Sequence, residues 1–99
     1  MDASRWYAMS VSEQILNIGG EVQRAVQRKE KGDPEGARDF LKKAMEWLEL
    51  SKSDPKNKNR VEELTLAGEE VEDYFNLNLW KNDSKSIMGY WDSFLSANF

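Results

Sequence analysis

Apolar residues recur at intervals of three and four along four separate stretches of this chain, and such spacing predicts four amphipathic helices. Before the first stretch, Ser10 and Glu13 have the spacing of a capping box, which begins a helix. The apolar positions that follow are Val11, Ile15, Ile18, Val22, Ala25 and Val26. We predict a helix from about Val11 to about Lys31, ended by Gly32, which suits the left-handed conformation past a helix end.

The second predicted helix begins at Asp33-Pro34, where Asp33 can cap the helix and Pro34 supplies the dihedral angle of its first position. Its apolar positions are Ala37, Phe40, Leu41, Ala44, Met45, Trp47 and Leu48. Because only the short link from Lys31 to Asp33 separates the first two helices, we expect them to pack antiparallel as a hairpin.

Two further stripes predict a third and a fourth helix. The third helix follows the polar stretch Ser51 to Asn59, in which Asp54-Pro55 repeats the start signal. It carries Val61, Leu64, Gly68, Val71 and Phe75 on one side, with Leu66 and Tyr74 beside this stripe. A connector from Asn76 to Ser84 follows, in which Asp83 or Ser84 can cap the last helix. That helix presents Ile87, Met88, Trp91, Phe94 and Leu95 on one face.

The segment before Ser10 contains Trp6, Tyr7 and Met9, so it is too apolar for a free tail and we expect it to fold back onto the helices. No useful stretch alternates with period two, and no Asn-Gly or Asp-Gly turn occurs, so no sheet is predicted. A chain of 99 residues holds one core and one domain, residues 1–99. The sequence therefore predicts an all-α fold, an antiparallel up-and-down four-helix bundle with an N-terminal segment packed on it.

Adjacent glycines, Gly19 and Gly20, interrupt the first predicted helix. Each costs roughly 1 kcal/mol there relative to alanine. The pair therefore indicates either close packing of another helix or a local bend, and we favour close packing.

The sequence contains no histidine and no cysteine. These side chains most often transfer protons near neutral pH, bind zinc or act as thiolate nucleophiles, so most familiar active sites are excluded. No nucleophile elbow, phosphate-binding loop or dinucleotide fingerprint occurs either. We therefore predict that the protein is not an enzyme and has no cofactor.

Charge is distributed unevenly along the chain. Residues 1–60 hold 12 Lys or Arg against 10 Asp or Glu, whereas residues 61–99 hold 2 against 8. General affinity for a phosphate backbone is therefore expected to be weak. A local basic patch is the exception, because Arg24 and Arg28 lie one helical turn apart and can join Lys42 and Lys43 of the neighbouring helix. These four residues are the candidate phosphate-binding site. The alternative role, for Arg24 and Arg28 together with Lys29 and Lys31, is to offset the negative dipole at the end of the first helix.

Acidic residues cluster on the third predicted helix, at Glu62, Glu63, Glu69, Glu70, Glu72 and Asp73. A di-iron bundle needs inward-facing carboxylates and Glu-x-x-His pairs, and this chain has no histidine. Glu69, Glu72 and Asp73 fall around the apolar stripe rather than on it, so we expect them to face water and predict no metal site. An acidic partner-binding surface is the alternative that remains.

Four tryptophans are more than the core of a small domain needs, and Trp is enriched where binding energy concentrates. Trp6 and Trp91 are expected in the core. Trp47 lies near the edge of its stripe and Trp80 in the connector beside Leu77 and Leu79, so both are candidates for partial exposure. Trp80 is the residue that we expect to touch a partner or a second copy, with anchoring of the connector as its alternative role.

One set of residues recurs together over most of the chain up to residue 75: Trp6, Met9-Ser10, Glu13-Gln14, Asn17, Gly19, Glu21-Val22, Arg24-Ala25, Lys29 to Gly32, Ala44, Glu46, Leu48 to Leu50, Asp54-Pro55-Lys56-Asn57, Arg60, Glu63-Leu64 and Asp73-Tyr74-Phe75. With these residues the chain resembles a small, functionally uncharacterised family of bacterial and archaeal proteins. The final helix matches more loosely. The resemblance implies no activity.

A broader resemblance is to HEPN-type helical bundles, which accompany nucleotidyltransferases or act as ribonucleases in toxin and antitoxin systems. Their catalytic pattern, an Arg followed after several residues by His, is missing because the chain has no His. The resemblance therefore implies a non-catalytic, antitoxin-like or accessory subunit. The Gly32 to Ala44 stretch also resembles one tetratricopeptide hairpin, but no second copy follows at the expected period of about 34 residues.

Two functions follow from these patterns. The first is a helical protein that acts through protein contacts, as a homo-oligomer or as the small subunit of a pair, with Trp80, Trp47, Glu69 and Glu72 as the candidate partner-binding residues. The second is a nucleotide- or RNA-binding module that uses the basic patch. The longest apolar runs are short and residues 1–5 do not resemble a secretory signal, so we expect no membrane span and a cytoplasmic location.

Overall fold

The computed structural model describes residues 2–98, and this part of the chain is helical with no strand. A short helix, α1 (Ala3–Tyr7), precedes two long ones, α2 (Val11–Glu30) and α3 (Pro34–Ser53). A 3-10 helix, η1 (Pro55–Arg60), leads into α4 (Val61–Phe75), and α5 (Ser84–Asn98) follows after a loop. The prediction of an all-α fold is therefore confirmed.

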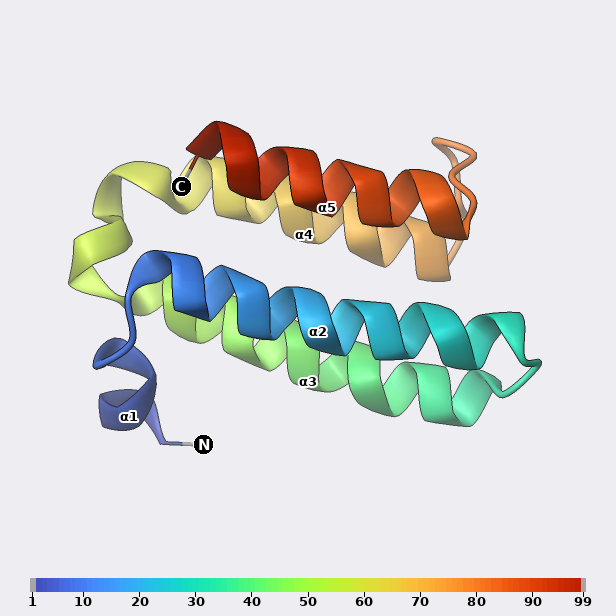
Figure 1. The fold of residues 1–99 in the computed structure, drawn as a ribbon, viewed down its shortest axis with the longest axis horizontal. Coiled ribbons are helices and arrows are strands. Elements are labelled where there is room, and N and C mark those ends of the chain that lie inside the picture. Colours follow the sequence, from blue (N-terminus) through green and yellow to red (C-terminus); the bar gives the residue numbers. More distant parts are fainter. Residues whose placement is uncertain (1, 99) are drawn as a thin grey trace.

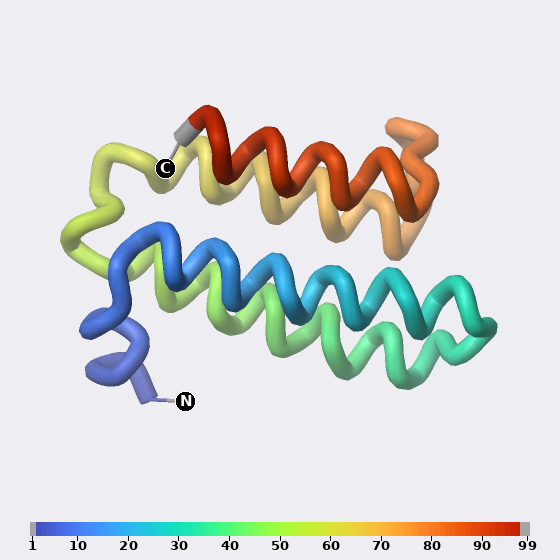
Figure 2. Tube along the Cα trace, in the orientation of Figure 1, coloured from blue at the N-terminus to red at the C-terminus, as the bar shows by residue number. Residues whose placement is uncertain are grey.

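Neighbouring long helices run in opposite directions (Figures 1 and 2). α2 and α3 form one hairpin and α4 and α5 a second one, and α2 also packs on α5 while α3 packs on α4. α1 contacts α3 and lies at the end of the molecule opposite to the loop between α4 and α5. No helix of residues 2–98 has the length and apolar character needed to cross a bilayer.

Local side-chain chemistry begins the first two long helices as predicted. The hydroxyl of Ser10 accepts a hydrogen bond from the Glu13 amide, and the Glu13 carboxylate accepts one from the Ser10 amide, which completes the capping box of α2. Asp33 caps α3 by accepting from the Gly36 amide at 2.9 Å. Gly32, between the two helices, has a φ of +76°, a conformation that glycine adopts without strain.

Asp33-Pro34 begins a long helix, but the second Asp-Pro pair, Asp54-Pro55, begins only a short 3-10 helix. Asp54 ends α3 and caps η1 rather than α4, with its carboxylate accepting from the Lys56 amide. α4 then begins at Val61 without a side-chain cap. The polar stretch thus forms a helical turn of its own that redirects the chain from α3 into α4.

The core lies between the four long helices and is closed by aromatic residues from α1 and α5. Its large members are Trp6, Ile15, Ile18, Val22, Leu48, Leu64, Val71, Tyr74, Ile87, Trp91 and Phe94. Gly19 lies against the indole of Trp91, and a Cβ atom at this position would be 2.5 Å from Nε1 of that ring. The prediction that close packing explains this glycine is confirmed for Gly19, whereas a Cβ at Gly20 would meet only the Arg24 side chain at 3.5 Å.

The prediction for the last turn of α4 is wrong in one respect. Tyr74, placed beside the apolar stripe, is buried with 4% of its surface exposed, while Phe75 is only half-buried. The buried face of α4 runs through Leu64, Ala67 and Val71 in steps of three and four, and Tyr74 continues this face. Lys29 of α2 lies over its ring, 3.8 Å from the centroid.

Candidate functional site

The loop between α4 and α5 carries three of the four most exposed large apolar side chains of residues 2–98. Leu77 is 78% exposed, Leu79 70% and Trp80 57%. Single exposed apolar side chains are common on protein surfaces. Three within four residues form an apolar projection from the surface, of the kind that marks interaction sites. The sequence prediction that Trp80 is partly exposed is confirmed.

This loop is held in a defined conformation by the end of α4. The carboxylate of Asp73 accepts hydrogen bonds from the amides of Leu79 at 2.9 Å and Trp80 at 3.2 Å. The amide of Asn78 donates to the Asp73 carbonyl at 2.6 Å. Asp73 therefore fixes the backbone that carries the apolar side chains, although those side chains themselves point away from the core.

Asn78 and Asn82 close the second half of the loop. The Asn78 side chain accepts from the Asn82 amide at 2.9 Å and donates to the Asn82 carbonyl at 2.8 Å, and the Asn82 side chain donates to Glu70. Asn78 and Lys81 have φ values of 50° and 52°, which are uncommon for residues other than glycine. The bonds described here keep the chain in this conformation.

Asp83 links the loop to α5. Its carboxylate accepts from the Ser86 amide at 2.7 Å, while its own amide donates to the Ser86 hydroxyl at 2.8 Å. Hydrogen bonds from Ser86 hold the pKa of Asp83 below its ordinary value. Of the two predicted caps for the last helix, Asp83 is the one used.

Two free carboxylates lie next to the apolar projection. Glu69, Glu72 and Asp73 line a shallow depression together with Asn76 and Leu77. Glu69 and Glu72 are exposed, as predicted, and neither carboxylate makes a hydrogen bond or an ion pair with any residue between 2 and 98. Asp73, also expected to face water, is instead half-buried because its carboxylate binds the loop amides. We call Glu69, Glu72, Asp73, Asn76, Leu77, Leu79 and Trp80 the loop surface.

Trp47, the other candidate aromatic residue, lies apart from the loop surface. It is half-buried on α3, with its ring centroid 5.2 Å from that of Trp6 in α1. The Lys43 ammonium lies 5.7 Å from the Trp47 centroid. The structure thus places Leu77 beside Glu69 and Glu72 and joins Trp80 to this region through Asp73. It leaves Trp47 at the α1 end, where it covers the core.

The four candidate phosphate-binding residues are exposed, and most already have partners. Arg24 forms an ion pair with Glu21 at 3.2 Å, and Arg28 one with Asp33 at 3.4 Å. Arg28 also lies over the Phe40 ring, and Lys43 over that of Trp47. Lys42 is exposed without a partner among residues 2–98. These pairs offset much of the positive charge that a phosphate would need.

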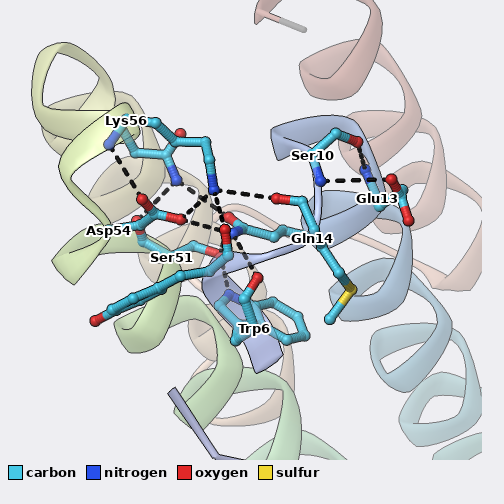
Figure 3. A network of polar contacts seen from close by, with 10 residues as sticks. Trp6, Ser10, Glu13, Gln14, Ser51, Asp54 and Lys56 are labelled. Atoms are coloured by element: carbon cyan, nitrogen blue, oxygen red, sulfur yellow. Dashed lines mark hydrogen bonds and ion pairs between the residues drawn. The ribbon is translucent and has the colours of Figure 1, made fainter. Parts of the chain in front are cut away.

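A buried polar network that joins α1, α2, α3 and η1 is a feature that the sequence analysis missed (Figure 3). Gln14 donates through Nε2 to the Trp6 carbonyl at 3.0 Å and to Asp54 at 2.8 Å. Its Oε1 atom accepts from the Ser51 hydroxyl at 3.0 Å and from Asn57 at 3.1 Å. The Trp6 indole donates to the Ser51 hydroxyl at 2.9 Å. The only signal in the sequence is the position of Gln14 on the apolar face of its helix.

Lys56 joins this network to the segment before α2. Its ammonium donates to the Asp54 carboxylate at 2.6 Å and to the carbonyls of Tyr7 at 2.7 Å and Met9 at 3.0 Å. Burial by itself raises the pKa of Asp54, but hydrogen bonds from Lys56 and Gln14 outweigh it and hold the pKa below its ordinary value. The network fastens α1 to the rest of the fold. Its groups bond to one another except for Asn57 Oδ1, which is buried without a hydrogen-bond partner among residues 2–98.

Among residues 2–98, no three acidic side chains come together as ligands for a metal ion. Comparison with known protein families, with curated proteins and with solved structures gives no match to this chain.

Proposed function

We propose that this protein is a non-enzymatic helical module, built as an antiparallel four-helix bundle with its N-terminal segment packed on it, that binds another polypeptide through the loop surface. The observation that carries the proposal is the exposure of Leu77, Leu79 and Trp80 on a backbone held in place by Asp73. An aromatic and aliphatic centre with a polar rim is typical of protein interfaces. Because the backbone is already ordered, binding costs little conformational entropy.

The partner that fits best is a segment with apolar side chains next to Lys or Arg. Glu69 and Glu72 have no partner within residues 2–98, and residues 61–99 hold 8 acidic against 2 basic residues. A second copy bound about a two-fold axis through this surface would bring these carboxylates toward their own counterparts, and such like-charge contacts are unfavourable. Charge complementarity therefore favours a basic partner over the homo-oligomer.

Peptide selection from a random library against the immobilised protein tests this proposal. We expect the selected peptides to combine Lys or Arg with aliphatic or aromatic residues. Trp80→Ala should weaken binding of a selected peptide at least about tenfold, as for an interface hot spot. The charge-reversed variant E69K/E72K should also weaken binding and should reduce its dependence on salt.

Leu16→Ala is the matched control, because Leu16 is 59% exposed, close to the 57% of Trp80, but lies on α2. It should leave peptide binding within about twofold of the wild type, as expected for a residue outside the interface. The proposal fails if the peptides show no preference for basic residues, or if the Leu16 and Trp80 variants bind equally. It also fails if sedimentation shows a dimer that Trp80→Ala dissociates, since the occupant is then a second copy.

The alternative function, binding of nucleotides or RNA by Arg24, Arg28, Lys42 and Lys43, has its own test. Mixed RNA is titrated at low salt against the wild type and against a variant with these four residues changed to Gln. Salt-dependent binding that this variant loses would support the alternative. Absence of binding at low salt would remove it.

A further inference from the structure

A second site borders the loop surface at Asn76, where the turn between α2 and α3 meets the end of α4. It is a half-open pocket of about 190 Å³. Ala37 and Leu41 of α3 and Phe75 of α4 supply apolar walls, while Lys29, Arg38 and Asn76 supply polar groups. We propose that this pocket binds a carboxylate attached to an apolar body. The proposal goes beyond the interaction module, because it requires none of the apolar side chains of the loop.

Arg38 supplies the charge that selects an anion. It is exposed on α3, and its guanidinium makes no hydrogen bond or ion pair with residues 2–98. The nearest acidic cap, Asp33, is already occupied by the Gly36 amide and by Arg28. A guanidinium can donate two parallel hydrogen bonds to one carboxylate, which gives both strength and orientation.

Lys29 offsets the negative C-terminal end of α4, which would otherwise repel an anion in the pocket. The carbonyl groups at a helix C-terminus carry partial negative charge and would repel an anion. The Lys29 ammonium lies 3.3 Å from the Tyr74 carbonyl and 3.8 Å from the centroid of the Tyr74 ring. It has three donors, so it offsets the helix end and still has donors available for a ligand.

The size of the pocket limits the apolar body. A closed cavity of about 150 Å³ holds benzene, so a pocket of about 190 Å³ accommodates one aromatic ring or a short branched chain. Two sources offer this chemistry. One is a free aromatic or short acyl acid, and the other is the C-terminus of a polypeptide that ends in an apolar residue.

The first probe is 3-phenylpropionate, titrated into isotope-labelled protein while the backbone amide signals are followed by NMR. We expect saturable shifts around Arg38 and Phe75, with a Kd of about 1 mM for a ligand of this size. The neutral 3-phenylpropanamide should bind about tenfold more weakly, because it lacks the charge that Arg38 recognises.

Variants separate the pocket from general charge. Arg38→Gln should weaken binding of 3-phenylpropionate about tenfold, whereas Lys42→Gln, an exposed cation on the same helix outside the pocket, should leave it unchanged. Ala37→Leu fills the apolar part and should abolish binding, with retention of the fold checked by circular dichroism. Trp80→Ala should have no effect, so failure here is distinguishable from failure of the loop surface.

The two sources are compared with N-acetyl-glycyl-phenylalanine in its free-acid and amidated forms. Tighter binding of the free-acid peptide than of 3-phenylpropionate identifies a polypeptide C-terminus, and the reverse order identifies a small acid. The proposal is overturned if no saturable shifts occur around the pocket or if the neutral probes bind as tightly as the acids. Equal effects of Arg38→Gln and Lys42→Gln would overturn it as well.

Discussion

Replacing each glycine of the Gly19-Gly20 pair by alanine tests whether α5 is seated on α2 as described. At position 19 the added methyl group would lie 2.5 Å from Nε1 and 2.8 Å from Cδ1 of Trp91. That indole is 2% exposed and donates a hydrogen bond to the Ile15 carbonyl at 3.3 Å, so it cannot swing into solvent without loss. At position 20 the nearest atom is the flexible end of Arg24 at 3.5 Å, an ordinary contact.

The expected difference in free energy of unfolding between the two variants comes from the contacts that only Gly19→Ala disturbs. Each alanine gains about 1 kcal/mol of helix propensity, which cancels in the comparison. Overpacking against the indole costs about 1–3 kcal/mol, and disturbing its buried hydrogen bond costs about 1 kcal/mol more. Gly19→Ala should therefore be less stable than Gly20→Ala by about 2–4 kcal/mol, which for a domain of this size separates their Tm values by more than about 8 °C.

Urea unfolding followed by circular dichroism and tryptophan fluorescence measures both variants against the wild type. Gly20→Ala should exceed the wild type in free energy of unfolding, and Gly19→Ala should fall below it. Equal stability of the two variants would refute the close contact between Gly19 and Trp91. A destabilised Gly20→Ala would instead show that Gly20 has a packing role that the structure does not contain.

Two further predictions concern the buried network around Gln14. A carboxyl whose pKa is lowered by folding stabilises the protein above its unfolded-state pKa of about 3.9, and this stability is lost as the pH falls through the folded-state value. The free energy of unfolding should therefore decrease below about pH 4, with a shallower decrease in Asp54→Asn; equal pH profiles would contradict the role of Asp54. Trp6→Phe removes the indole N–H that donates to the Ser51 hydroxyl. It should lower the free energy of unfolding, measured in urea, by about 1–3 kcal/mol. Hydrogen exchange should then show faster opening of α1, and unchanged protection there would contradict the fastening role of the network.

The helix starts depend on interactions between residues close in sequence, which is why they were predictable. Ser10 and Glu13 satisfy each other's amides across three residues, and Asp33 reaches the Gly36 amide over the same distance. The periodic apolar stripes need only the geometry of a single helix. The exposure of Glu69 and Glu72 follows from the same geometry.

The candidate site was predictable in part. The connector position of Trp80 beside two leucines indicated exposure, but nothing local indicated that Asp73 holds the backbone amides of Leu79 and Trp80. The sequence predicted Trp47 to be a partner-binding residue on the same grounds as Trp80, yet the fold places Trp6 against Trp47. The difference between these two tryptophans depends on which segments lie nearby.

What the sequence by itself determined is the helical class, the approximate extent of each helix and the absence of histidine and cysteine chemistry. The tertiary structure decided which glycine of the pair is constrained, which polar residues are buried and which cations already have partners. Gln14 and Asn57 lie 43 residues apart along the chain and still share a hydrogen bond. Such contacts depend on how whole helices pack, because burial and pairing depend on neighbours in space, whereas capping and periodicity depend on neighbours in sequence.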